Sequence, residues 1–213
     1  ALKGAQTLDG KIAQFGGRSR WITSLESRTS AHRLRAEYDA VLIGATTAQL
    51  DNPRLNVRLA KGRNPTRVLL DGNLSTPLSC RLFTDSLRSQ TIIYCREDGK
   101  QELAKKKTVL RSRGARVVEI AAGRDGFIDV RAVLRHLAVE GINSVLVEGG
   151  QHVFTEFLTQ GLVDKAYFFV APKIVGCNGL PAFGELSRGF RSLQFTSLHI
   201  EDVGNDILME GYL

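Results

Sequence analysis

The strongest constraint on the fold of this chain is a series of short apolar runs, rich in branched side chains, separated by segments of helical length. The runs occupy residues 39–44, 66–71, 91–95, 115–120 and 144–148. Apolar runs of this length are typical of strands buried on both faces of a sheet. Their alternation with helices predicts an α/β protein with a largely parallel sheet and helices on both faces.

Capping residues and apolar stripes predict the helices between these runs. The segment Thr23-Ser-Leu-Glu26 matches a capping box, so we expect a helix from there to about Glu37. Asp129 can cap a second helix, and a third begins near Gly150. The stripes expected to face the core are Val130, Val133, Leu134 and Leu137 in the second helix and Val153, Phe154, Phe157 and Leu158 in the third.

The last quarter of the chain predicts a different arrangement. Strand patterns follow one another at residues 165–171, 190–200 and 206–213, and residues 202–206 form a good hairpin turn. Consecutive strands joined by tight turns pair antiparallel. We therefore expect a mixed sheet that is largely parallel and has antiparallel strands at its C-terminal end.

The composition restricts the classes of partner. The chain has 213 residues, of which 43% are hydrophobic and 24% charged, as in ordinary globular proteins. Its formal net charge of +7 suits nucleic acid or small anionic ligands. However, the arginines are dispersed, no aromatic residues interleave with basic ones, and the one dense run, Lys105-Lys106-Lys107, is predicted to be the solvated end of a helix. We therefore expect small anionic ligands and no nucleic-acid partner.

Cysteine usage and apolar patterning indicate a cytoplasmic protein. Cys80, Cys95 and Cys177 are widely spaced, which suits a reducing compartment and favours neither a disulfide framework nor a structural zinc site. No apolar run approaches the roughly 18–20 residues of a membrane span, and no signal-peptide pattern is present. The chain starts without Met, and we expect that it was cut from something longer, for example a two-domain enzyme.

Three segments carry candidate functional residues. In the first, a turn at Leu8-Asp-Gly-Lys11 is followed by Gly16-Gly17 and then by Ser19-Arg-Trp-Ile-Thr23. A strand, a glycine turn, a polar loop and a helix start can bring several polar groups to one cleft. The alternative is a surface hairpin in which Trp21 only covers the core.

The second segment runs from Gly44 to Arg58. Gly44 ends a buried strand, and ligands of α/β sheets bind at such strand ends. Thr46 and Thr47 then lie at a helix start, where free amides favour anionic groups. Asp51 ends this short helix before Pro53. Asp51 could equally be a turn residue, and Arg58 a solvated arginine.

The third segment is Val147-Glu148-Gly149-Gly150, in which a buried strand meets two glycines and a helix start. Glycines let the backbone approach a pyrophosphate, whose charge the helix N-terminus favours. The pattern is not the G-x-G-x-x-G fingerprint, and a tight structural turn is the alternative. Glu148, at the end of an apolar strand, should be exposed in a cleft or hydrogen-bonded. The sequence lacks P-loop, nucleophile-elbow, zinc-protease and zinc-deaminase motifs, and we expect no metal.

Taken in order, these fragments resemble one family, the C-terminal reductase domain of the bifunctional riboflavin biosynthesis deaminase–reductase. The resemblance covers essentially the whole chain as one domain, residues 1–213. Its fragments are Leu8-Asp-Gly-Lys11, Trp21-Ile-Thr23, Leu34-Arg35-Ala36, residues 39–44, Asp51-Asn-Pro53, Val68-Leu-Leu-Asp71, Val147-Glu148-Gly149-Gly150, Leu162-Val-Asp164 and Ala171-Pro-Lys173.

The resemblance implies a dihydrofolate-reductase-like fold, NADPH as cofactor and 5-amino-6-(5-phosphoribosylamino)uracil as substrate. The ribosyl group of that substrate would be reduced to a ribityl chain. The family also leads us to expect a homodimer, formed through the C-terminal strands, and a deaminase domain fused to the reductase in the full-length protein.

Matching positions imply the site residues. The cofactor would be bound by Ala5, Trp21, Thr47, Asp51, Gly149, Gly150, Gln151, His152, Val153, Phe154, Thr155 and Glu156. The substrate would be bound by Ser19, Arg35, Leu55, Arg58 and Glu148. Two positions depart from the family pattern. Thr7 replaces the usual Ser. Gly72, which we also expect at the cofactor, replaces a Ser that contacts the cofactor in at least some relatives. Gly72 can offer only backbone there.

The chemistry of this substrate suggests roles for four of these side chains. Hydride addition at C1′ of the sugar must be accompanied by a proton at the ring oxygen, so we expect Asp51 and Lys11 to be the catalytic residues. Arg35 and Arg58 suit the substrate phosphate, because a guanidinium makes paired hydrogen bonds to it. The whole assignment requires that Lys11, Asp51 and Gly150 share one cavity around the nicotinamide and the sugar.

Other functions remain open at this stage. A related reductase acts on the diamino pyrimidinone form of the substrate before deamination, and the two substrates differ at one exocyclic group. A true dihydrofolate reductase is a second alternative, although this chain is longer and opens differently. The third is a non-catalytic nucleotide-binding module of the same fold.

Overall fold

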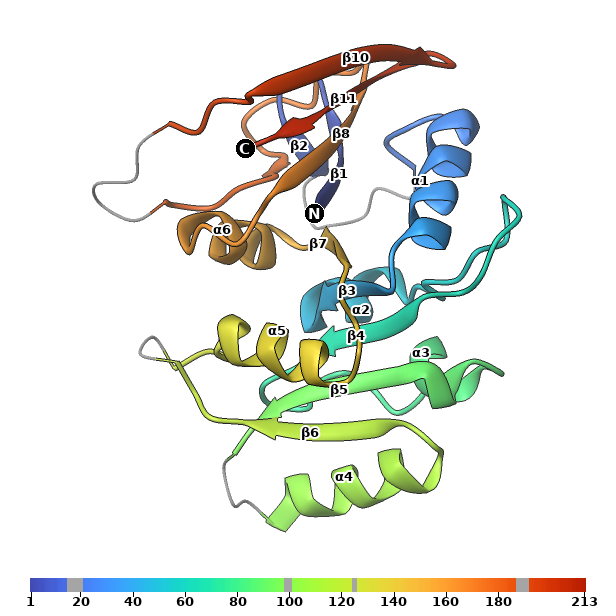
Figure 1. Ribbon diagram of the computed structural model, residues 1–213, viewed down its shortest axis with the longest axis vertical. Coiled ribbons are helices and arrows are strands. Elements are labelled where there is room, and N and C mark those ends of the chain that lie inside the picture. The colour runs from blue at the N-terminus through green and yellow to red at the C-terminus, as the bar shows by residue number, and fades with distance from the viewer. Residues whose placement is uncertain (15–20, 98–100, 124–125, 187–191) are drawn as a thin grey trace.

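The computed structural model describes residues 1–14, 21–97, 101–123, 126–186 and 192–213 (Figure 1). The strands are β1 (Leu2–Thr7), β2 (Lys11–Ala13), β3 (Ala40–Gly44), β4 (Thr66–Leu70), β5 (Thr91–Arg96), β6 (Arg116–Ile120), β7 (Val145–Gly149), β8 (Lys165–Ala171), β9 (Leu180–Pro181), β10 (Ser197–Val203) and β11 (Asp206–Tyr212). The helices are α1 (Leu25–Glu37), α2 (Ala45–Asp51), α3 (Arg81–Thr84), α4 (Gln101–Ser112), α5 (Val130–Val139) and α6 (Gln151–Thr159).

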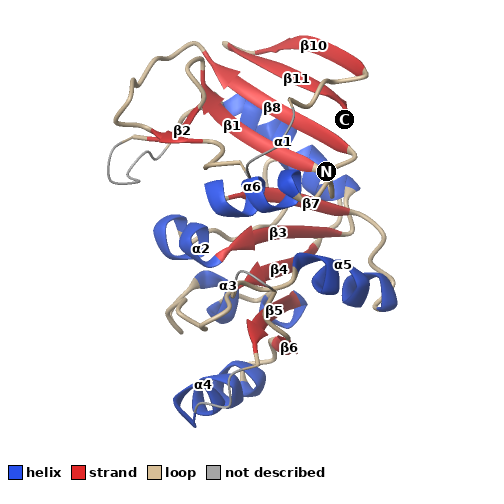
Figure 2. Cartoon of the chain, turned by 90° about the vertical axis from the view of Figure 1, so that its left-hand side faces the viewer, coloured by secondary structure: helices blue, strands red, loops and turns tan. Residues whose placement is uncertain are grey.

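Within these ranges, nine strands form one sheet in the order β10-β11-β8-β1-β7-β3-β4-β5-β6, and β2 pairs with β9 in a small second sheet. All neighbours from β8 to β6 are parallel, whereas β11 is antiparallel to β8 and β10 is antiparallel to β11. Figure 2 shows this order along the length of the molecule. The predicted mixed, largely parallel sheet with antiparallel C-terminal strands is confirmed.

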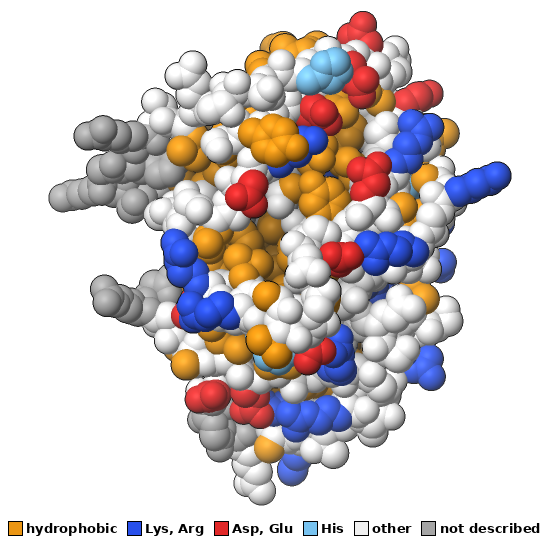
Figure 3. All heavy atoms as spheres, in the orientation of Figure 1, with side chains coloured by type: hydrophobic (Ala, Val, Ile, Leu, Met, Phe, Trp, Pro, Cys, Tyr) orange, Lys and Arg blue, Asp and Glu red, His pale blue; other side chains and the backbone are white. Residues whose placement is uncertain are grey.

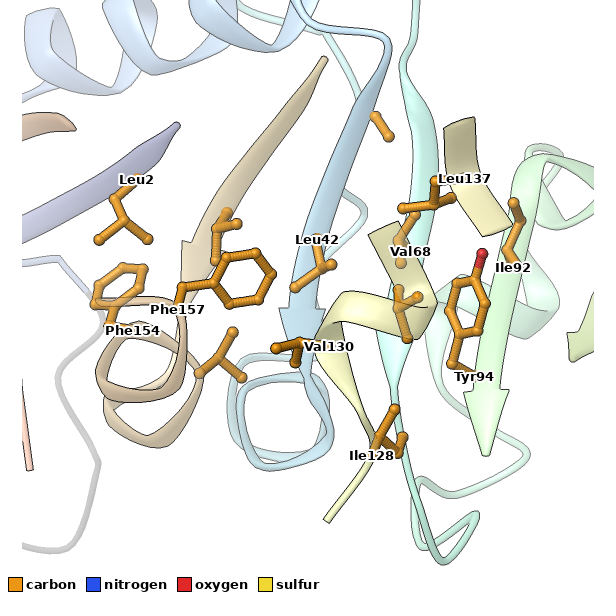
Figure 4. Close-up of a cluster of buried hydrophobic side chains, with 14 of the residues drawn as sticks. Leu2, Leu42, Val68, Ile92, Tyr94, Ile128, Val130, Leu137, Phe154 and Phe157 are labelled. Atoms are coloured by element: carbon orange, nitrogen blue, oxygen red, sulfur yellow. The ribbon is translucent and has the colours of Figure 1, made fainter. Parts of the chain in front are cut away.

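Helices cover both faces of the sheet. Side chains of each strand alternate between the two faces, so each face presents apolar side chains that a helix can bury. On one face, Leu42 and Val68 pack with apolar residues of α5 and α6, among them Val130 and Phe157 (Figure 4). On the other face, Val41, Ile43 and Leu69 pack against residues of α2, α3 and α4, and a third cluster joins α1 to β7, β8 and β11. The predicted two-sided covering is confirmed.

The first strand lies in the middle of the sheet, between two strands from the last third of the chain. Leu2 is paired with Val147 of β7 and with Ala166 of β8. The Ala1 ammonium group donates to the Val145 carbonyl oxygen at 2.8 Å. This insertion carries residues 3–5 to the strand end at which β7 meets α6, and so it brings distant segments together.

Two local predictions are wrong. The cap of α1 is Ser24 and not Thr23: the Ser24 hydroxyl accepts from the Ser27 amide at 3.2 Å, and the Ser24 amide donates to Asp206 at 2.6 Å. The predicted strand at residues 190–200 begins only at Ser197 in the described part of the chain.

The prediction of a solvated lysine run is wrong for Lys106 and Lys107, whereas Lys105 is exposed. Residues 105–107 lie inside α4, and two of these side chains fold onto the protein. The Lys106 ammonium donates to the Thr76 carbonyl oxygen at 2.7 Å, and the Lys107 ammonium lies 2.7 Å from a carboxylate oxygen of Glu119. Within the described ranges, no helix has both the length and the apolarity that a membrane crossing requires.

Candidate active site

A cavity of about 1450 Å³ lies along the carboxyl ends of the parallel strands. Its walls come from β1, β2, α1, the β3–α2 junction, the loops after α2 and β4, the end of β5, and the β7–α6 corner. Carboxyl ends of parallel strands are the usual ligand site of α/β sheets. The volume exceeds the roughly 300–1,000 Å³ of most small-molecule pockets, so the cavity has room for two ligands side by side.

The β7–α6 corner offers free backbone amides to this cavity. Gly149 and Gly150 have φ angles of +147° and +96°, which favour glycine. Gly150 is the N-cap of α6 and provides no side-chain cap. A Cβ atom at Gly150 would lie 3.0 Å from the Thr47 hydroxyl oxygen, so the absence of a side chain keeps the corner open. Unsatisfied amides at the start of a nine-residue helix suit a pyrophosphate.

Arg35 of α1 and Glu148 of β7 form a buried ion pair on one wall. The Arg35 guanidinium donates from Nε to Oε1 at 2.5 Å and from Nη2 to Oε2 at 2.6 Å. Burial alone would raise the pKa of the Glu148 carboxyl, but the adjacent Arg35 holds this pKa below its usual range. Arg35 also donates from Nη1 to the Asn56 carbonyl oxygen at 3.2 Å. Its guanidinium therefore fixes a carboxylate in the cavity, whereas the sequence predicted a phosphate ligand.

Positive charge is concentrated around Arg58. Burial and the charges of Arg35, Arg54, Arg28 and Arg81 together lower the pKa of Arg58, and all five arginines line the cavity. On the face drawn in Figure 3, by contrast, Lys and Arg side chains are spread over the surface. Closely spaced guanidinium groups repel one another until an anion lies between them, so this arginine cluster suits a phosphate monoester.

His32 positions the backbone of this arginine cluster. Its Nδ1 accepts from the Arg58 amide at 3.2 Å, and its ring is buried. Burial first, and then the charges of Arg35 and Arg58, lower the pKa of His32 to about 4. The imidazole is therefore neutral at pH 7, and its protonation would add a further positive charge to a region that already holds several.

Asp51 ends α2 and opens onto the cavity. The following residue, Asn52, adopts a left-handed conformation with φ 43° and stops the helix. Protein atoms that partly shield the Asp51 carboxyl from water raise its pKa. A carboxyl group with a raised pKa can exchange a proton with a ligand more readily at neutral pH.

Residues 1–209 match the family model described as the RibD C-terminal domain. The chain belongs to this family. It is 38% identical over 213 residues to the riboflavin biosynthesis protein RibD of Aquifex aeolicus, and the match covers 98% of this chain and 56% of that protein.

Two solved structures of the RibD family are similar over 99% of the chain. RibD of Acinetobacter baumannii has a TM-score of 0.82 at 27% identity, with 56% of that chain covered. The diaminohydroxyphosphoribosylaminopyrimidine deaminase/5-amino-6-(5-phosphoribosylamino)uracil reductase of Thermotoga maritima has a TM-score of 0.79 at 36% identity, with 55% covered. The chain thus spans about half the length of these RibD relatives.

Most residues predicted from the RibD resemblance line the cavity. Those lining it are Ala5, Trp21, Arg35, Thr47, Asp51, Leu55, Arg58, Gly72, Glu148, Gly149, Gly150, Gln151, His152, Val153, Phe154 and Glu156. Thr155 does not line it: its hydroxyl donates to the Gln151 carbonyl oxygen at 2.7 Å and accepts from the Gly184 amide at 2.8 Å. Ser19 lies outside the described residues. The Trp21 ring, 55% exposed, carries the Arg28 guanidinium 3.9 Å above it.

The expected convergence of three segments holds for Asp51 and Gly150 but is wrong for Lys11. Lys11 is absent from the cavity wall, although its neighbours Ile12 and Ala13 contribute to it. The stem of Lys11 instead packs over Gly179, where a Cβ atom would lie 2.7 Å from the lysine Cγ. The lysine of β1 that does line the cavity is Lys3. Burial lowers the pKa of Lys3, and the nearby Glu148 carboxylate opposes this effect.

Sequence reasoning missed several other residues of this RibD-family cavity, namely Arg28, His32, Arg54, Arg81 and Arg96. Arg28, Arg54 and Arg81 are far apart in the sequence, and no spacing pattern connects them. The described residues contain no group of three His, Cys, Asp or Glu side chains that could hold a metal ion.

Proposed function

We propose that this domain reduces the ribosyl group of 5-amino-6-(5-phosphoribosylamino)uracil with NADPH to the ribitylamino product. The observation that carries the proposal is that one cavity combines a glycine corner for a pyrophosphate, an arginine cluster for a phosphate monoester, and two titratable groups, Asp51 and Lys3. The similar protein from Thermotoga maritima is named as a reductase of this substrate.

The glycine corner fits the pyrophosphate of a dinucleotide. Amides at the start of α6 and the Thr47 hydroxyl would hold it, with Ala5 and Phe154 on the adjoining wall. When bound, a nicotinamide cofactor would supply the hydride. The protein supplies the orientation of the two ligands and exchanges protons.

The substrate fits the remaining part of the cavity. Its phosphate would lie against the arginine cluster, where Arg58 has no carboxylate partner among the described residues. The Glu148 carboxylate, held by Arg35, would accept hydrogen bonds from N–H groups of the pyrimidine. Opening of the sugar ring requires a proton at the ring oxygen. We assign this transfer to Asp51, with the Lys3 ammonium group stabilising negative charge that develops on that oxygen.

The domain would act within a larger protein. Since the chain covers only 56% of the Aquifex relative, we infer that a deaminase domain accompanies it in the full-length protein. We also keep the family expectation of a homodimer as part of the proposal.

Loss of NADPH absorbance tests the function directly. The purified domain is supplied in turn with the uracil substrate and with its diamino pyrimidinone counterpart. We expect oxidation with the uracil form, and a decrease in kcat of about 100-fold or more for Asp51→Asn. Oxidation with the diamino form alone would assign the rival substrate, and oxidation with neither would indicate a binding module without catalysis.

A further inference from the structure

Arg96 is a further cationic side chain that lines the cavity, outside the arginine cluster around Arg58. Arg96 is the last residue of β5, and it lines the cavity together with Gly72 and Asn73 from the loop after β4. Neither the fold prediction nor the proposed reaction uses this arginine. Its sequence neighbours carry no motif that would have indicated a ligand.

The Arg96 side chain is held in place by neutral groups. Its Nη1 donates to the Gly126 carbonyl oxygen at 2.7 Å, and its Nη2 donates to the Asn73 side-chain oxygen. The backbone is fixed as well, because the Arg96 amide donates to the Gly72 carbonyl oxygen at 3.1 Å. These contacts orient the guanidinium without neutralising it.

Gly72 makes room for this arrangement. A Cβ atom at Gly72 would lie 3.3 Å from Nε and 3.4 Å from Cγ of Arg96, which is a tight contact. The arginine thus lies directly over the bare backbone of residue 72. At this position, the cationic side chain occupies the space that a side chain at residue 72 would take.

The charge of Arg96 is uncompensated in the described part of the chain. Arg35 is paired with Glu148 and Arg67 with Asp85, but none of the described carboxylates forms an ion pair with Arg96. An oriented guanidinium that faces a cavity, and whose protein partners are all neutral, is a site for an anionic ligand group.

The sheet order relates this site to the pyrophosphate corner. β7, β3, β4 and β5 are successive neighbours, so the end of β5 lies about 14 Å from the end of β7 at the usual strand spacing. A dinucleotide bound at Gly150 has two halves, and the nicotinamide half must extend toward Asp51 and Lys3. The adenosine half then extends across the end of β4 toward Arg96.

We propose that Arg96, oriented by Asn73, binds the 2′-phosphate of NADPH and makes this domain select NADPH over NADH. This inference rests on the proposed function, because the position of the cofactor pyrophosphate at Gly150 is part of that proposal. The 2′-phosphate is the one group that distinguishes the two cofactors, and a guanidinium can make paired hydrogen bonds to it.

Calorimetric binding of two adenosine ligands tests the site without catalysis. The ligands are 2′,5′-ADP and 5′-AMP, which differ only in the 2′-phosphate. For Arg96→Gln we expect the Kd of 2′,5′-ADP to rise about 10- to 100-fold, the loss typical of a charge-assisted hydrogen bond, with the Kd of 5′-AMP unchanged. Arg33→Gln removes the same charge from an exposed position on α1 and should change neither Kd.

Steady-state kinetics with both cofactors separate this inference from the proposed function. We expect Arg96→Gln to raise the KM for NADPH and not that for NADH. Arg96→Lys and Asn73→Ala should give smaller shifts in the same direction, which covers the case in which Arg96→Gln fails to fold. Wild-type turnover of the pyrimidine with an unchanged NADPH preference in these variants would overturn the role of Arg96 alone. Arg96-dependent binding of 2′,5′-ADP without any turnover would overturn only the proposed reaction.

Discussion

Lys3 and Lys11 stand eight positions apart, yet only Lys3 lines the cavity. The turn that contains Lys11 is the more conspicuous pattern in the sequence, and it attracted the prediction. What decides between the two lysines is the position of β1 beside β7, because that pairing brings Glu148 near Lys3. The local sequence around Lys3 does not indicate this long-range neighbour.

The two lysines give a matched pair of variants. We expect Lys3→Gln to lower kcat by about 100-fold or more, since in the proposed reaction it removes a cation from the sugar oxygen that accepts the proton. Lys11→Gln should change kcat less than about threefold, because its side chain packs on Gly179 outside the cavity. Steady-state rates of NADPH oxidation at saturating substrate measure both effects. A larger loss for Lys11 than for Lys3 would restore the interpretation made from the sequence.

At the level of elements, the apolar runs predicted β3, β4, β5, β6 and β7 within about one residue, whereas no such run indicated the parallel strand β1. β3 is apolar throughout, and β4 and β7 are apolar apart from Thr66, Arg67 and Glu148, as expected of strands buried on both faces. The predicted N-cap of α1 was one residue too early, because Thr23 and Ser24 are both good N-cap residues. The choice is made by Asp206 of β11, whose carboxylate accepts from the Ser24 amide and the Ser27 hydroxyl, each at 2.6 Å.

Asp206 should therefore link α1 to the β10–β11 hairpin energetically. We expect Asp206→Ala to lower the free energy of unfolding by about 1–3 kcal/mol, since it leaves the buried Ser27 hydroxyl and the partly buried Ser24 amide without this acceptor. Asp202→Ala, at an exposed position of the same hairpin, should cost less than about 0.5 kcal/mol. Urea unfolding of the three proteins measures the difference. Equal costs at the two positions would show that the cap is energetically unimportant.

At the level of the whole molecule, the cavity is formed by residues that the sequence keeps far apart. Residues of β1, α1, the α2 junction, β5 and the β7–α6 corner surround one space. Patterning predicted the class of the sheet and the residues at the ends of β3 and β7, whereas the family resemblance implied most of the other lining residues. It did not predict the strand order, and therefore missed the gathering of Arg28, Arg54 and Arg81 around Arg58.

Ligands that connect several of these segments should stabilise the whole domain. At about 100 times its Kd, NADPH should add about 2.7 kcal/mol to the free energy of unfolding and raise Tm by roughly 5–10 °C. Gly150→Val should lose this increase, because its Cβ atom would crowd Thr47 and its backbone would be strained at φ +96°. Thermal scans with and without NADPH measure both. An equal increase in Tm for Gly150→Val would exclude the β7–α6 corner as the pyrophosphate site.

The central place of β1 also has a consequence for synthesis on the ribosome. Both partners of this strand, β7 and β8, follow it by more than a hundred residues, since Leu2 pairs with Val147 and Ala166. At roughly 5–20 residues per second, translation leaves β1 without its sheet partners for about 7–30 s. During that interval its apolar residues and unpaired backbone are open to chaperones, and the ligand cavity is completed only after Leu180 of β9, which follows β8, has emerged.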